Sequence, residues 1–144
     1  MIQNLSKRIK ITKVSDYAAA NTTDITTDVI DMQGYDGVVF FTAVAVLHAN
    51  NYIKLQEGDA ANLSDAADLL GTKVAVTVNK EVVGVDLYKP LKRYVRAYIE
   101  RGGASTACGE VYAMQYEGRI LPEDNETAGT LNIELHISPI AGTA

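Results

Sequence analysis

The segment Arg93-Tyr94-Val95-Arg96-Ala97-Tyr98-Ile99-Glu100 decides the fold class of this chain. β-branched and aromatic residues, which favour strands, fill most of its positions. Successive side chains of a strand point to opposite faces, so one face carries Tyr94, Arg96 and Tyr98. The other face carries Arg93, Val95, Ala97 and Ile99. The segment therefore predicts a strand with one buried face and one polar, aromatic face.

Comparable strand-like segments, separated by Gly, Asn, Asp and Pro, recur over residues 9–14, 29–32, 38–47, 52–58, 73–78, 82–88, 108–116 and 131–137. The region 15–26 is rich in small residues and predicts a loop with irregular pairing at most. Sequential short strands with turn residues between them favour antiparallel pairing, and we expect 108–116 to form a hairpin with 93–100. We predict an all-β antiparallel sandwich or jelly roll, with residues 1–144 forming a single domain.

One short helix is expected near residues 64–70. Ser64 is a natural N-cap, Asp65 favours the positive end of a helix, and Gly71 is a common C-terminal stop. The predicted helix has one or two turns.

Composition narrows the class of partner. The chain has 144 residues, an apolar fraction of 47% and a formal net charge of −5. An acidic balance disfavours nucleic-acid binding, because that affinity comes from Lys and Arg. The sequence has no stretch near the roughly 20 apolar residues that a membrane helix needs, and no apolar signal-peptide core. The lone Cys108 cannot form an internal disulfide, which is compatible with synthesis in a reducing cytoplasm.

No group of residues predicts catalysis, a cofactor or a metal. The two histidines, His48 and His136, have no spacing that brings them together. The turn Ser105–Gly109 has no G-x-S-x-G frame and no neighbouring His to activate a nucleophile. Carboxylates are dense around the expected helix, and calcium binding there stays open because their spacing does not match an EF-hand: Glu57, Asp59, Asp65 and Asp68.

The Tyr94, Arg96 and Tyr98 face is the first candidate interaction site. Tyrosine and arginine are enriched at protein interfaces. They can also stack on nucleic-acid bases, which the net negative charge disfavours. The third interpretation is a partly buried strand whose tyrosines contact neighbouring cations of the same chain.

Three segments together resemble jelly-roll decoration, or cement, proteins of tailed bacteriophage capsids. They are Asp31-Met32-Gln33-Gly34-Tyr35-Asp36-Gly37-Val38-Val39-Phe40, Leu55-Gln56-Glu57-Gly58-Asp59 and Asp86-Leu87-Tyr88-Lys89-Pro90-Leu91-Lys92-Arg93-Tyr94-Val95-Arg96. The resemblance lies in the pattern of strands and turns and covers residues 31–122.

The resemblance implies a mechanical, non-enzymatic role. Such proteins sit as homotrimers on the outside of the virion and clamp neighbouring major capsid proteins after synthesis in the host cytoplasm. On this basis an N-terminal arm at 1–14, with Ile9 and Ile11, and the strand at 131–137 become candidates for inter-subunit or capsid contact. The resemblance does not extend over either terminal segment, and each could instead complete its own sandwich.

Other functions stay open. Another phage structural component, such as a head–tail connector or tail protein, would have the same fold. A carbohydrate-binding β-sandwich would need exposed aromatic side chains over a polar groove, and the chain has no Trp. An enzyme is the least favoured, although fold alone does not decide function.

Overall fold

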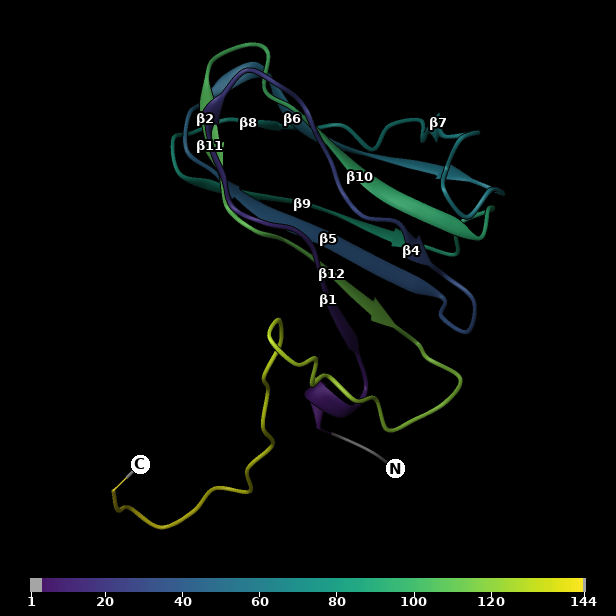
Figure 1. Cartoon of the computed structure of the whole chain (residues 1–144), viewed down its shortest axis with the longest axis vertical. Coiled ribbons are helices and arrows are strands. Elements are labelled where there is room, and N and C mark those ends of the chain that lie inside the picture. The colour runs from purple at the N-terminus through teal and green to yellow at the C-terminus, as the bar shows by residue number, and fades with distance from the viewer. Residues whose placement is uncertain (1–3, 144) are drawn as a thin grey trace.

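Alternating apolar side chains turn one face of each long strand toward a shared core, and two sheets enclose that core (Figure 1). The computed structural model describes residues 4–143. The all-β antiparallel sandwich predicted from the sequence is confirmed. A single 3-10 turn, η1 (Leu5–Lys7), precedes the first strand.

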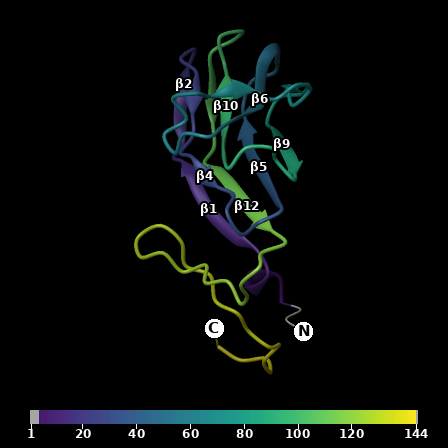
Figure 2. The same ribbon diagram turned by 90° about the vertical axis from the view of Figure 1, so that its right-hand side faces the viewer.

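The first sheet, which we call sheet A, has six strands. They are β1 (Lys10–Ser15), β2 (Ala18–Asn21), β5 (Gly37–Val44), β9 (Glu81–Tyr88), β11 (Thr106–Cys108) and β12 (Val111–Tyr116). Figure 2 shows β1, β12, β5 and β9 side by side in that order, so β1 and β9 are opposite edges.

The second sheet, sheet B, also has six strands, four of which are very short. They are β3 (Ile25–Thr26), β4 (Ile30–Asp31), β6 (His48–Gly58), β7 (Ala67–Asp68), β8 (Val74–Val76) and β10 (Tyr94–Glu100). Strand β10 pairs with β6 over seven positions, from Tyr94 opposite Gly58 to Glu100 opposite Tyr52.

The strand order is that of a jelly roll. Sheet A runs β1, β12, β5, β9, and sheet B runs β4, β10, β6, β8, with every pair antiparallel. This order is that of two interlocked Greek keys, in which most connections cross from one sheet to the other. The hairpin predicted between 93–100 and 108–116 is wrong because the chain makes such a crossing there: β10 belongs to sheet B, and β11 and β12 belong to sheet A.

The core lies between the sheets. Its largest fully buried side chains include Phe40 from sheet A and Ile53, Leu55 and Ile99 from sheet B. Cys108 is also fully buried, and burial raises the pKa of its thiol. The cysteine therefore packs as a small apolar side chain.

Neither the predicted helix at 64–70 nor the predicted strand at 131–137 is present. Residues 61–71 form turns and the short strand β7. The carboxylate of Asp65 accepts hydrogen bonds from the backbone N–H groups of Asp59 (2.7 Å) and Ala60 (3.1 Å), residues that precede it. Asp65 thus closes a loop instead of starting a helix. Residues 132–140 are extended and unpaired, although Leu131 forms one isolated bridge with Thr127.

Candidate interaction surfaces

The outer face of sheet B carries the aromatic and basic residues singled out from the sequence. Tyr94, Arg96 and Tyr98 share this face, as predicted, because the alternate residues of β10 are buried in the core. Each of the three is partly exposed. The register places Arg96 opposite Gln56 and Tyr98 opposite Lys54 on β6.

The polar groups of this face bond to other residues of the same chain. The guanidinium Nε of Arg96 donates to Oε1 of Gln56 at 2.8 Å. The hydroxyl of Tyr98 donates to Asp24 at 2.6 Å, and the ammonium of Lys54 lies 4.9 Å from the centre of its ring. These contacts match the interpretation of a partly buried strand with cation–π contacts. Use of the face as an interface stays a prediction.

Two tyrosines of this face are held in the neutral form. The hydrogen bond from the Tyr98 hydroxyl to Asp24 raises the pKa of Tyr98 to about 12. The hydrogen bond of Tyr52 to Glu100 raises the pKa of Tyr52 to about 12 in the same way. In both cases ionisation would place a phenolate beside a carboxylate, which is unfavourable.

The outer face of sheet A is more apolar. Ile11 of β1 lies opposite Met114 of β12, and the rings of Phe41 and Tyr112 are 5.8 Å apart. Ile9 and Ile11, the two N-terminal residues predicted to make contacts, are partly buried. Residues 1–3 of the expected N-terminal arm lie outside the described residues, and residues 10–15 form β1, an integral strand of sheet A.

A tyrosine of β12 contacts β9 across this face. The hydroxyl of Tyr116 donates to Asp86 of β9 at 2.6 Å, and its ring stacks on Tyr88 with centroids 6.4 Å apart. Gly37 on the intervening strand β5 makes this possible, since a Cβ there would lie 2.1 Å from Cζ of Tyr116. The missing side chain leaves the space in which the ring lies.

The β1 edge of sheet A is closed by a buried asparagine. Asn125 is only 3% exposed. Its amide nitrogen donates to the carbonyls of Ser6 (2.7 Å) and Ile9 (2.8 Å), and its Oδ1 accepts from the N–H of Ile11 (2.8 Å). At Ile9 and Ile11, where β1 starts, the side chain thus takes the place of a neighbouring strand, and we call this the sealed edge.

Strand β2, which extends sheet A on the same side, is joined to its neighbour β11 by Arg101, which lies where their pairing is irregular. This buried guanidinium donates to the carbonyls of Ala19 (2.8 Å), Thr106 (2.9 Å) and Thr23. Arginine has five N–H donors in a fixed plane, so one side chain can satisfy several backbone carbonyls.

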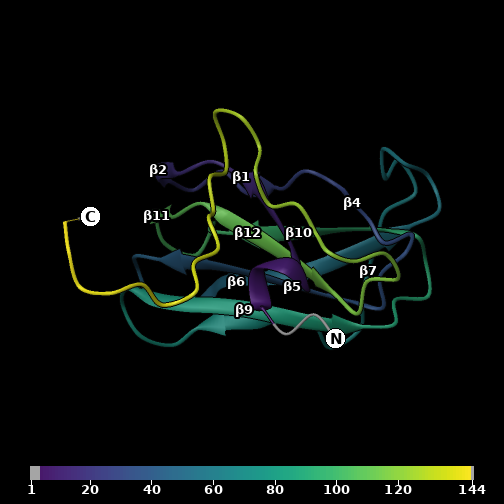
Figure 3. The same cartoon turned by 90° about the horizontal axis from the view of Figure 1, so that it is seen from below.

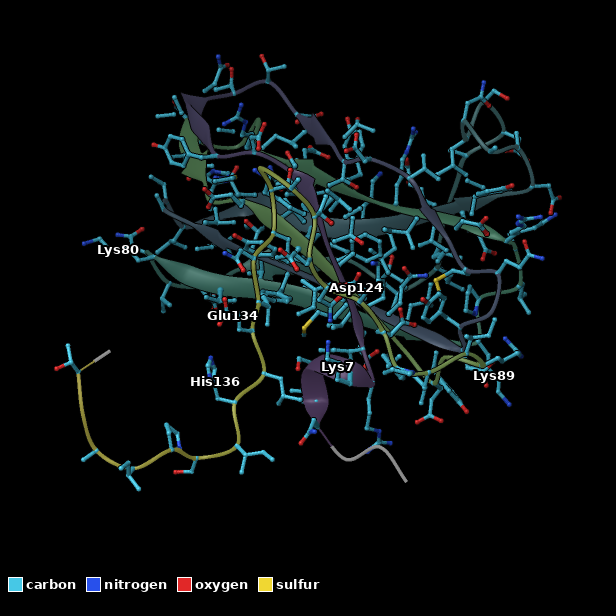
Figure 4. The ribbon with its side chains drawn as sticks, turned by 60° about the horizontal axis from the view of Figure 1, so that its bottom comes forward. Lys7, Lys80, Lys89, Asp124, Glu134 and His136 are labelled. Atoms are coloured by element: carbon cyan, nitrogen blue, oxygen red, sulfur yellow. The ribbon has the colours of Figure 1, made fainter. Side chains whose placement is uncertain are left out.

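The opposite edge, β9, is open. Among residues 4–143, β9 pairs with β5 alone, over eight successive positions without a bulge, and no other group bonds to its backbone. Its sequence, Glu-Val-Val-Gly-Val-Asp-Leu-Tyr, contains no Lys or Pro to protect the edge. Lys80 and Lys89 flank the strand, one at each end (Figure 4). We call this the open edge.

The C-terminal segment presents unpaired apolar side chains. Along residues 131–137, which we call the C-terminal arm, Leu131, Ile133, Leu135 and Ile137 alternate with polar residues. Leu131 and Ile133 are partly buried, whereas Leu135 is 44% exposed and Ile137 is 93% exposed. His136 and Glu134 lie on the other face and approach one another at 3.1 Å.

The carboxylates around 57–68 do not converge on a common point. Asp68 bonds to Lys54 (2.7 Å) and Gln56 (2.8 Å), and the hydrogen bond to Lys54 lowers its pKa. Asp59 pairs with Lys92. Within residues 4–143, no group of three or more His, Cys, Asp or Glu side chains could hold a metal ion.

Sequence reasoning missed two buried polar residues that bond to strand backbones, Asn125 and Arg101. Asn125 stands in a polar stretch after Pro122 that predicts an exposed loop, and Arg101 follows a strand as an ordinary terminal charge. Nothing in the local pattern distinguishes either from a solvated side chain. Their partners lie more than 70 residues away for most bonds, so only the tertiary fold identifies them.

Comparison with known proteins adds a fold likeness. No protein-family model matches the chain, and no curated protein matches it. The crystal structure of the SPBc2 prophage-derived protein YomS is similar, with a TM-score of 0.44 and 9% sequence identity, over 80% of this chain and 97% of that chain. A likeness of this degree carries no argument about function. In the described part of the chain, no helix has the length and apolar character to cross a membrane.

Proposed function

We propose that this chain is a structural virion protein of a tailed bacteriophage. It binds the outer surface of the capsid as a homotrimer and stabilises the shell by clamping neighbouring major capsid proteins. The role is mechanical and non-enzymatic, and it requires no cofactor, nucleic acid or membrane.

One observation supports this proposal most: the jelly roll has an open eight-residue edge, β9, and an unpaired apolar arm at 131–137. Exposed edges and apolar strands promote association, and proteins that act alone usually protect them. Here the start of β1 is closed by Asn125, while β9 has no such group. A protein that works in a multi-copy shell would cover such an edge on assembly.

The stabilising mechanism follows from mass action. A ligand that binds only the completed lattice lowers the free energy of that lattice relative to its separated subunits. Three linked copies would bind three lattice sites, so modest single-site affinities would combine into strong attachment.

Quantitative mass spectrometry of purified phage particles tests the proposal. We expect a copy number close to that of the major capsid protein. A few copies per particle would instead indicate a head–tail connector or tail protein, and absence from particles would overturn the virion role. Mixing the purified protein with capsids that lack it, followed by co-sedimentation, tests attachment to the outer surface directly.

A further inference from the structure

We infer that the C-terminal arm of one copy, residues 131–137, adds as an extra strand to the open edge of β9 in a second copy. This inference deepens the proposed function, on whose homotrimer it rests, by naming the contact that joins the copies. It identifies the occupant of the edge as a segment of this same chain.

The edge has the geometry that strand addition requires. Alternate N–H and C=O groups of an edge strand point away from the sheet and can pair with a new strand. β9 presents this row without a bulge over eight residues. The other edges of the described sheets are closed in part by a side chain, as at β1, or consist of strands of two to four residues.

The C-terminal arm has the length and the side-chain alternation of a strand that could pair with β9. It is a seven-residue segment with strict alternation, about the length of β9, and its residues 132–137 have no backbone partner. Isoleucine and leucine occupy every second position, a pattern typical of a strand with one buried face. When such a strand adds to a sheet edge, it gains both backbone hydrogen bonds and apolar contacts.

The arm of a given copy does not lie along its own β9. Thr127 and Leu131 exchange backbone hydrogen bonds of 2.7 and 2.8 Å, which turn the chain back on itself. Thr130 lines a hollow with Val14 and Asp28, on the β1 side of the sandwich. The start of the arm is therefore held near the sealed edge, three strand spacings or about 14 Å from β9 across the sheet.

The views agree that the chain leaves the body after this turn. The C-terminal segment lies below both sheets in Figures 1 and 2, and the C-terminus lies to the side of the sandwich in Figure 3. Glu134 and His136 mark this path in Figure 4, where Lys80 and Lys89 mark the two ends of β9. The arm is thus placed to contact a neighbour.

Side-chain exposure decides which face of the arm lies on which side. Val82 and Tyr88 point outward from β9 and are 66% and 58% exposed, whereas the inward-facing Val83 is already buried. The inward-facing Val85 and Leu87 are partly buried against the core, so the most exposed apolar area of β9 lies on its outward face. The Leu and Ile side chains of the arm therefore lie beside Val82 and Tyr88 and extend the apolar outer face of sheet A.

The contact is heterologous: an arm on one copy meets an edge on the next. Such contacts close into a ring when the rotation between copies permits it, and three copies give the homotrimer. Each copy then gives one arm and receives one, and no β9 edge remains open.

Sedimentation velocity of the purified full chain, over a series of concentrations, tests the arm. Variant I133D/L135D adds two carboxylates on the apolar face, and variant N132D/H136D adds two on the polar face as a matched control. We expect the wild type and the control to form the same oligomer. The apolar-face variant should have a dissociation constant raised about 100-fold or more, because two aliphatic side chains would no longer be buried.

Three results would overturn the inference: a wild type that is monomeric at every concentration, equal association of the two variants, or association that persists when residues 131–144 are deleted. Circular dichroism should be unchanged in all variants, since the arm is unpaired in the single chain. A wild type that is monomeric in solution yet present on particles would refute the arm contact alone. An oligomer that is absent from particles would refute the virion role alone.

Discussion

The two edges of sheet A differ in whether their outward-facing backbone groups have hydrogen-bond partners. At β1, the backbone groups of Ile9 and Ile11 that face outward bond to the side chain of Asn125. At β9, the corresponding groups have no partner among the described residues. A short loop that returns to the sheet is enough to close an edge, so the lack of one at β9 marks that edge as a place for a second chain.

The difference also concerns how each edge strand is held. The sealed edge is attached through loop residues 123–125, where the N–H of Glu123 donates to Lys7 and Tyr35 donates to Glu123 at 2.6 Å. The open edge is attached from within the sheet, by its ladder to β5 and by Tyr116. Each attachment can be broken separately.

Replacing Asn125 by alanine should have the largest effect. The substitution removes three hydrogen bonds at a site that is 3% exposed and should lower the free energy of unfolding by about 2–3 kcal/mol. Urea denaturation followed by circular dichroism measures this. Asn132→Ala, at an exposed position in the arm, is the control and should leave the free energy unchanged. Equal effects would refute the sealing role.

Gly37→Ala should loosen the open edge from its own sheet. The new Cβ would overlap the Tyr116 ring, so the ring must move and the Tyr116–Asp86 hydrogen bond and the Tyr88 stack would weaken. We expect a loss of about 1–2 kcal/mol in the free energy of unfolding. Gly102→Ala, where a Cβ meets open space, is the matched control. In the double variant with Tyr116→Ala, most of the penalty should disappear.

Alkaline pH should weaken both attachments together. Burial, followed by the hydrogen bond to Glu123, raises the pKa of Tyr35 to about 12, and burial with the hydrogen bond to Asp86 does the same for Tyr116. A tyrosine in the unfolded chain has a pKa near 10. Because the folded-state pKa is the higher one, the stabilisation is complete below pH 10 and is lost as the pH rises toward 12.

Thermal melts at successive pH values measure this loss. Tyr35→Phe and Tyr116→Phe should each flatten the decline between pH 10 and pH 12. A decline of the same steepness in both variants would show that other groups cause it.

Val82→Lys should have the smallest effect on the folded chain and a clear effect on association. The side chain points outward from β9 and is 66% exposed, so the free energy of unfolding should change by no more than about 0.5 kcal/mol. A lysine on an edge strand opposes strand addition, and oligomers should dissociate at higher concentration. Lysine at Thr22, an exposed position on the β2 side, serves as the control. Loss of association in both variants would indicate a general charge effect.

The sequence predicted the strands better than their partners. Alternation in 93–100 correctly placed Tyr94, Arg96 and Tyr98 on one face, because the period of a strand is a local property. The hairpin predicted between 93–100 and 108–116 failed because the choice of sheet depends on the whole chain. The alternation of apolar and polar residues at 131–137 shows that this segment is able to pair as a strand. Whether it does so depends on a partner strand, which the segment itself does not specify.

Polar side chains were the least predictable part. Ser64 and Asp65 have the pattern of a helix start, yet two backbone donors that precede Asp65 bind its carboxylate and form a turn. In the sequence, Asn125 has the features of an exposed loop residue. In the folded chain its side chain bonds to the backbones of Ile9 and Ile11. In both cases hydrogen bonds of the folded chain decide the local structure, and the local sequence pattern does not identify the partners of those bonds.

Hydrogen–deuterium exchange of the β9 peptide 81–88 tests the arm contact most directly. In a single chain, alternate amides of β9 face the open edge and should exchange rapidly. We expect these amides to become protected as the concentration of the full chain rises, and we expect I133D/L135D to abolish this gain while N132D/H136D retains it. Exchange that is independent of concentration, or equal in the two variants, would refute the arm contact.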